Sequence, residues 1–187
     1  MITPECIISF PAIWEPKENP SGALKYGCSI LIDKADVKGV AEFQKEIDKA
    51  VAKGKSTITA WKGKVPNFKY KPLRDGDEEL ANGDKSDACY KGRYFINCSS
   101  NTAPGVVGPN AKPLMDQEAL YAGAVVRLDL NAFPYANSGN NGIGWGLNNV
   151  MLVRDGDRLD GKQRAVDAFA GFVSGATEEA AGDSDLM

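Results

Sequence analysis

The sequence predicts a mainly β protein with one long helix, an arrangement typical of a small closed barrel. Several short segments alternate apolar and polar residues, as half-buried strands do. One longer segment repeats apolar residues at three- and four-residue steps, as an amphipathic helix does. Glycine- and proline-containing stretches separate these segments, and 187 residues suit one domain better than two.

The first half predicts two strands and the helix. Residues 5–10 predict a short strand, followed by a turn region that three prolines interrupt. Residues 26–33 alternate cleanly and predict a second strand. Asp36 is a suitable N-cap for a helix that starts at Val37, and Gly54 is suited to end it.

The second half predicts three more strands. Residues 75–87 are polar and acidic, which favours a surface loop. Residues 92–99 and 124–133 alternate again, and a glycine-asparagine turn leads to a last strand over 143–153. Five strands with insertions fit a Greek-key barrel of the OB type.

Two of these strands each place an arginine and a phenylalanine on the face away from the core. Arg93 and Phe95 face outward from the predicted strand over 92–99. Arg127 and Phe133 face outward from the predicted strand over 124–133. The assignment could be reversed for Phe95, because Tyr94 is also a good stacking residue.

Trp145 has two open interpretations. It alternates with Ile143 and Leu147, which slightly favours a place in the core, and a stacking platform is the other. The glycine at every second position from 142 to 146 resembles a dinucleotide fingerprint, but no helix follows it. Close backbone packing or a bend in the barrel explains these glycines better.

Residues 53–74, KGKSTITAWKGKVPNFKYKPLR, are the strongest functional signal. They contain seven basic residues, no acidic residue and three aromatic rings, in a chain with 22 basic and 25 acidic residues. Cations interleaved with rings suit a strand whose phosphates and unstacked bases are both exposed, which means single-stranded nucleic acid. The simpler alternative is a solvated loop whose rings pack into the core.

The composition argues against catalysis. There is no histidine, which removes serine–histidine and cysteine–histidine chemistry and the usual zinc sites. The four cysteines are scattered without a CxxC pair and are expected to be buried thiols. We therefore expect a protein that is not an enzyme and needs no cofactor or metal.

Arg-Asp-Gly-Asp occurs at 74–77 and again at 154–157. Paired aspartates could hold a divalent cation, which would be the route to a nuclease or a strand-annealing enzyme. An Asp-Gly turn is the simpler interpretation of both. A further alternative is a protein-interaction module whose basic groove accepts an acidic partner.

Charge is distributed unevenly along the chain. The net charge is −3, yet after Arg164 there are five acidic residues and no basic one. We expect an OB-type domain over 1–172 and a disordered acidic tail over 173–187. Such a tail can compete with DNA for a basic groove and recruit other proteins, through Glu178, Glu179, Asp183 and Asp185.

No apolar run approaches the ~20 residues of a membrane span, and the first residues lack the layout of a secretion signal. The expected compartment is the cytoplasm, with no membrane partner.

A resemblance to a known family rests on segments in chain order. They are Phe10-Pro11, Trp14-Glu15-Pro16, Lys25-Tyr26, Leu31-Ile32-Asp33-Lys34, Trp61-Lys62-Gly63-Lys64, residues 73–79, residues 93–97, residues 104–107, Tyr121-Ala122-Gly123, residues 146–150 and Arg154-Asp155-Gly156. The chain resembles phage-encoded single-stranded DNA-binding proteins of the OB-fold group, distantly related to the short-tailed phage helix-destabilising proteins. The resemblance implies binding of single strands in phage replication, recombination or repair inside an infected bacterial cell. It also implies that the acidic tail regulates binding and recruits replication proteins.

The sequence thus predicts sequence-tolerant binding of single-stranded DNA. Duplex DNA and RNA are expected to bind more weakly, and a homodimer stays open. We expect base stacking by Trp61, Phe68, Tyr70, Phe95 and Phe133, with Tyr94 and Tyr135 as further candidates. We expect phosphate contacts by Lys62, Lys64, Lys69, Lys71, Arg74, Lys91, Arg93 and Arg127.

Overall fold

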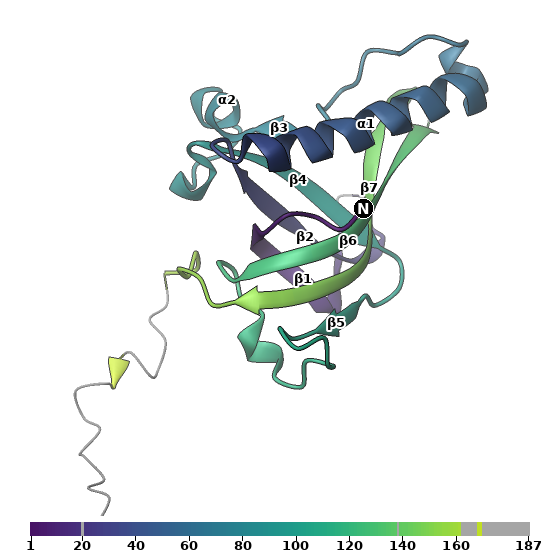
Figure 1. Ribbon diagram of the computed structural model, residues 1–187. Helices are drawn as coiled ribbons and strands as arrows, with labels where there is room; N and C mark the ends of the chain where they lie inside the picture. Colours follow the sequence, from purple (N-terminus) through teal and green to yellow (C-terminus); the bar gives the residue numbers. More distant parts are fainter. Residues whose placement is uncertain (20, 138, 162–167, 170–187) are drawn as a thin grey trace, which may run out of the picture.

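The computed structural model describes residues 1–161 apart from residues 20 and 138, together with residues 168–169 (Figure 1). The predicted domain boundary at residue 172 and the acidic tail lie outside the described residues. The elements, in chain order, are β1 (Cys6–Glu18), β2 (Leu24–Asp33), α1 (Val37–Thr57), η1 (Thr59–Trp61), β3 (Arg74–Asp75), α2 (Gly76–Ala81), η2 (Ala88–Tyr90), β4 (Arg93–Ser100), β5 (Gly105–Val107), η3 (Gln117–Ala119), β6 (Val125–Asn137) and β7 (Asn140–Arg154).

Five long strands close into a barrel in the order β1–β2–β4–β7–β6, and β6 returns to β1. Neighbouring strands are antiparallel except β4 and β7, which pair in parallel and complete the ring. β3 adds to the edge of β4, and β5 adds to the edge of β7. The mainly β barrel with one long helix is therefore confirmed.

The barrel interior holds the alternating apolar residues that the sequence indicated. Ile30 and Ile32 from β2, Ile96 from β4, and Val126 and Leu128 from β6 are all buried in one core cluster. Residues at the intervening positions of the same strands lie on the barrel exterior. This parity fixes which side chains can meet a ligand on the outer surface.

α1 lies across the upper end of the barrel in Figure 1 and buries Phe43 and Ile47 in the same core. It begins as predicted, because Asp36 Oδ1 accepts a hydrogen bond from the Gly39 N–H at 3.0 Å. It ends at Thr57, three residues beyond Gly54. Neither α-helix in the described part of the chain combines the length and apolar character that a membrane crossing requires.

β1 is longer than the sequence suggested. The predicted strand ended at Phe10 before a proline-rich turn, whereas β1 runs through Pro11 and Pro16 to Glu18. Its register with β2 shifts between Ser9 and Ala12 and again between Ala12 and Lys17. Each proline lies within a shift, where the regular ladder is interrupted and a missing N–H can be tolerated.

The predicted surface loop over 75–87 contains the short helix α2. Asp75 caps it, because its side chain accepts hydrogen bonds from the N–H groups of Asp77 and Glu78. η2 follows, and Tyr90 and Phe95 pack edge to face with 4.8 Å between ring centroids. The segment from α2 to η2 therefore covers the outer face of β4 at Phe95.

Trp145 belongs to the core. Its indole N–H donates to the carbonyl of Pro72 at 2.9 Å, and its ring meets Phe43 edge to face at 5.8 Å. The core interpretation of this residue is correct.

Trp61 is also buried, with 3% of its surface exposed. Its ring takes the space above Gly54, where an added Cβ would lie 2.2 Å from the ring. Its indole N–H donates to Asn141 Oδ1 at 3.2 Å, and its ring packs on Phe68 at 5.6 Å. The ring joins the end of α1 to the start of β7.

Replacing Trp61 with alanine should destabilise the fold by about 3–5 kcal/mol, because it leaves a cavity where a buried aromatic ring stood. Urea unfolding followed by circular dichroism measures this change. Trp61→Phe keeps part of the packing and should cost less. A loss below about 1 kcal/mol for Trp61→Ala would contradict the packing role.

Candidate nucleic-acid interface

The basic stretch begins in the last turn of α1, passes through η1 and continues as a loop to β3 at the edge of β4. The Pro72 carbonyl is held by Trp145, and β3 pairs with β4 at Phe95 and Tyr94. Lys62, Lys64 and Lys69 are exposed along this loop, and in the described part of the chain their side chains form neither an ion pair nor a hydrogen bond. These three cations are available to an external anion.

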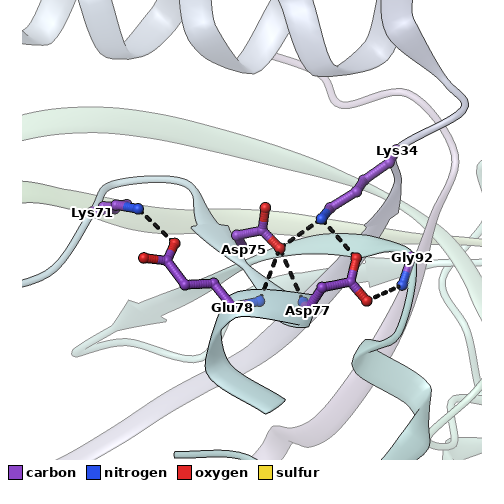
Figure 2. Close-up of polar contacts among 6 residues, drawn as sticks. All are labelled: Lys34, Lys71, Asp75, Asp77, Glu78 and Gly92. Carbon is purple, nitrogen blue, oxygen red and sulfur yellow. Dashed lines mark hydrogen bonds and ion pairs between the residues drawn. The ribbon is translucent and has the colours of Figure 1, made fainter. Parts of the chain in front are cut away.

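The last two cations of the stretch are neutralised by α2. Lys71 Nζ contacts Glu78 Oε2 at 2.5 Å, as Figure 2 shows, and Arg74 forms two parallel hydrogen bonds with Glu79 at 2.6 Å each. A pocket of about 390 Å³ between the loop and α2 is lined by both signs of charge, including Asp84. This junction suits a polyanion less well than the exposed lysines do.

The first Asp-Gly-Asp pair ties three segments together (Figure 2). Lys34 Nζ lies 2.6 Å from Asp75 Oδ1 and 2.7 Å from Asp77 Oδ2. Asp77 Oδ1 also accepts the Gly92 N–H at 2.9 Å. These carboxylates bind a lysine and backbone donors, and no cluster of three metal-ligating side chains occurs in the described part of the chain.

The electrostatics of this cluster follow from Lys34. The hydrogen bond from Lys34 lowers the pKa of Asp77, with help from the Gly92 N–H. Burial raises the pKa of Asp75, but Lys34 and the N–H groups of α2 more than offset this and leave that pKa lowered. Partial burial lowers the pKa of Lys34, and its two aspartate partners more than offset this in turn.

The second Asp-Gly-Asp pair is also part of the fold. The Tyr121 hydroxyl lies 3.3 Å from Asp155 Oδ1, donates to the Gly156 carbonyl at 2.9 Å and accepts the Gly156 N–H at 3.1 Å. These contacts give Asp155 and Gly156 a structural role. Neither pair forms the predicted Asp-Gly turn, because Asp75 caps α2, which begins at Gly76, and residues 155–157 follow β7 without a turn.

Small residues form a band across the exterior of β2, β4, β7 and β6. We call this the small-residue band. Strand register connects its members laterally, since Ser29 pairs with Asn97, Gly27 with Ser99, Ser99 with Gly146, and Gly146 with Asn131. The band consists of Gly27, Ser29, Asn97, Ser99, Gly144, Gly146 and Asn131. It contains amide, hydroxyl and backbone groups and no carboxylate.

Aromatic rings border the band on the β6–β7 hairpin. Phe133 pairs with Gly144 and Tyr135 with Gly142 across the hairpin. A Cβ at either glycine would lie 2.6 Å from the facing aromatic side chain, so each ring occupies the space of a missing side chain. Phe133 is 41% exposed in this position. The alternating glycines thus seat aromatic rings on the outer surface.

The other predicted stacking residues divide into exposed and covered ones. Tyr70 is 54% exposed, with the Arg74 guanidinium 5.3 Å from its ring centroid. Phe68 and Tyr94 are half-buried; Phe68 packs on the Trp61 cluster, and Lys34 lies over Tyr94. The prediction of stacking by Trp61 and Phe95 disagrees with their burial.

Phe95 does point away from the barrel interior, as expected. Its outward face is covered, however, by Tyr90 from η2 and by the Arg74 guanidinium, 4.7 Å from the ring centroid. An alternating strand cannot reveal that the preceding segment, from Arg74 to Tyr90, folds over its outer face. The same pattern therefore gives an exposed Phe133 and a buried Phe95.

The remaining predicted cations are Arg93 and Arg127, near the starts of β4 and β6, and Lys91, which precedes β4. Arg93 donates to the Cys89 carbonyl at 2.7 Å. Arg127 lies 3.5 Å from Glu5, which also pairs with Arg154. Lys91 is exposed beside η2. The eight predicted phosphate contacts are therefore not gathered in one groove.

The β1–β2 hairpin supplies two cations that sequence reasoning missed. Lys17 and Lys25 are direct cross-strand partners, and Lys25 shares the outer face of β2 with Gly27 and Ser29. Like charges directly opposite destabilise a strand pair, so this arrangement favours an anion nearby. The sequence did not indicate that Lys17 and Lys25 are partners, because the prolines of β1 suggested a turn in place of a strand.

A closed five-stranded barrel with one long helix, and with cations and rings on its outer face, is the architecture typical of OB-type proteins. The chain belongs to the family of the Enterobacter phage Enc34 single-stranded DNA-binding protein, whose family model matches residues 1–183.

Individual relatives agree with this assignment. The chain is 28% identical over 159 residues to protein p50 of Acyrthosiphon pisum secondary endosymbiont phage 1, covering 82% of this chain and 83% of that protein. The bacteriophage Enc34 single-stranded DNA-binding protein in complex with ssDNA has a TM-score of 0.68 at 20% identity, covering 84% of this chain and 87% of that one. The single-stranded DNA-binding protein gp2.5 of bacteriophage T7 has a TM-score of 0.58 at 17% identity, covering 98% of both chains.

Replacing Lys34 with methionine should destabilise the fold near neutral pH, because Asp75 and Asp77 lose their shared partner. A carboxyl group with a lowered folded pKa contributes stability above its unfolded pKa of about 3.9 and loses it as the pH falls through the folded value. The gap in unfolding free energy between wild type and Lys34→Met should therefore narrow below about pH 4. Lys38→Met, at an exposed helix position, is the control. A gap that is constant from pH 7 to pH 2 would contradict this linkage.

Proposed function

We propose that this protein binds single-stranded DNA with little sequence preference and makes or breaks no covalent bond. The observation that carries this proposal is the small-residue band. It lies between the cationic pair of the β1–β2 hairpin and the glycine-seated rings of the β6–β7 hairpin.

The groups around the band match the two exposed parts of an unpaired strand. Lys17, Lys25 and the exposed lysines of the basic loop neutralise phosphates and release counterions. Phe133, Tyr135 and Tyr70 offer ring faces for bases, and every base has a π-face, so stacking tolerates any sequence. The absence of bulky side chains along the band lets the strand approach the barrel closely.

The comparisons support the ligand class. Among proteins with this fold, one phage protein is known in complex with ssDNA, and the T7 protein is named for the same activity. We infer a role in phage DNA replication, recombination or repair, in the cytoplasm of the infected cell. Metal-dependent cleavage finds no support, because Lys34 and backbone donors engage the first aspartate pair.

The acidic tail is part of the proposal, on the strength of its sequence. Its four carboxylates at Glu178, Glu179, Asp183 and Asp185 stand in a stretch without a basic residue. A polyanion attached to the domain competes with DNA for the same lysines and leaves them when DNA binds. Once released, the tail is available to replication proteins.

Phe133→Ala should weaken binding of an oligo-dT by roughly 5- to 150-fold, because one stacked base is worth about 1–3 kcal/mol. A titration followed by fluorescence anisotropy of a labelled oligonucleotide measures the change. The dependence of log K on log salt should keep its slope, since no phosphate contact is removed.

Met115→Ala is the matched control, because Met115 is an exposed apolar residue in the segment after β5, away from the band. Duplex DNA of the same length tests the preference for unpaired strands. Equal affinity of wild type and Phe133→Ala for oligo-dT would count against the proposed surface.

Deleting residues 173–187 should tighten DNA binding, most strongly at low salt, because an internal competitor of the DNA phosphates is removed. The comparison uses full-length and truncated protein titrated with the same oligonucleotide at two salt concentrations. A variant with Gln or Asn at the four acidic tail positions separates charge from length. Unchanged or weaker binding by both variants would refute competition by the tail.

A further inference from the structure

We propose that Phe10 is a further base-stacking residue, placed where the small-residue band meets β1. The inference rests on the proposed binding of single-stranded DNA and adds a contact that neither the aromatic-basic stretch nor the outward-facing phenylalanines indicated.

The backbone at Phe10 is the first observation. Its φ of 47° lies in the left-handed region, which residues with a Cβ adopt at a cost and which glycine adopts freely. Phe10 and Pro11 lie in the register shift between Ser9 and Ala12, where two residues of β1 oppose one of β2 as in a β-bulge. Folding alone would be served better here by glycine or asparagine than by an aromatic residue.

The exposure of the ring is the second observation. Phe10 is 62% exposed, so the ring gains little from burial that could offset the strained backbone. Backbone strain that no burial of the side chain offsets indicates that the residue serves function and not stability. A large ring held out from the barrel is suited to contact a ligand.

The place of the ring identifies that ligand. The residues on either side of the register shift pair with the band, Ser9 with Ser29 and Ala12 with Gly27. A ring that leaves the barrel at this bulge therefore lies beside the floor of the band, one strand away. An unpaired strand that crosses Gly27 and Ser29 would present its bases to this ring.

The surface beside Phe10 consists of backbone and small side chains. A Cβ at Gly27 would lie 2.5 Å from the Cys98 carbonyl, so the floor beside Phe10 is bare backbone. Ser29 donates to Asn97 at 2.6 Å and keeps the neighbouring floor flat. Lys17 and Lys25 follow further along the same two strands. The β1–β2 hairpin thus offers a ring and two cations in sequence, as a nucleotide requires.

Phe10→Gly separates binding from folding, because glycine removes the ring and also relieves the backbone. We expect oligo-dT affinity to fall roughly 5- to 150-fold, the range for one stacked base, with an unchanged salt slope. The thermal midpoint should stay equal or rise. Phe10→Trp should keep wild-type affinity, and Phe10→Asn should behave like Phe10→Gly.

Ala111→Gly is the matched control. Ala111 also has a left-handed backbone, with φ of 58°, and lies in the turn after β5. It should raise the thermal midpoint without changing DNA affinity. This separates the loss of the ring from any general effect of relieving strain.

Each outcome bears on a defined claim. If Phe133→Ala weakens binding and Phe10→Gly does not, Phe10 is not a stacking residue and the proposed function stands. If neither variant changes affinity, the band itself is the wrong surface. If Phe10→Gly lowers the molar mass of the protein in light scattering but leaves its DNA affinity unchanged, the ring serves self-association and the inference is overturned.

Discussion

The parallel pairing of β4 with β7 is the constraint on which the candidate interface depends. Without it the sheet would be open, and the small residues of β2 and β4 would be separated from those of β6 and β7. Cys98 beside Trp145, and Ser99 beside Gly146, join the two halves. The pair is anchored inside by Trp145, which contacts α1 through Phe43 and the basic loop through Pro72. Core packing and the continuity of the outer surface therefore have the same origin.

The density of basic residues along the sequence is a poor measure of how many cations are free to bind a ligand. The basic stretch is followed at once by α2, whose glutamates engage Lys71 and Arg74. Those two cations pair with α2, and the Arg74 guanidinium together with the Tyr90 ring of η2 covers Phe95. The beginning of the stretch keeps its charge for a ligand, whereas its end organises the fold. One sequence signal thus carries two physical roles.

Sequence periodicity predicted the helices and strands well where one face of the element is buried in the core and the other is not. The capped helix, the outward position of Phe133 and the inward position of Trp145 all follow from such patterns. The predictions that failed depend on how neighbouring segments fold over a residue. Trp61 is covered by α1 and by the start of β7, and Phe95 by Arg74 and Tyr90, and strand or helix periodicity reveals neither contact. Phe10, Lys17 and Lys25 were missed because prolines in β1 resembled a turn, and only the register with β2 reveals their position.

The glycine seats of β7 have a consequence for how such a surface is studied. Gly142 and Gly144 can act without contacting a nucleotide. The orientation of Tyr135 and Phe133 depends on the side chains that these two positions lack. A footprint drawn from atoms in contact with a ligand would pass over them. Their influence on recognition is exerted from beneath, through the tilt of the rings that they support.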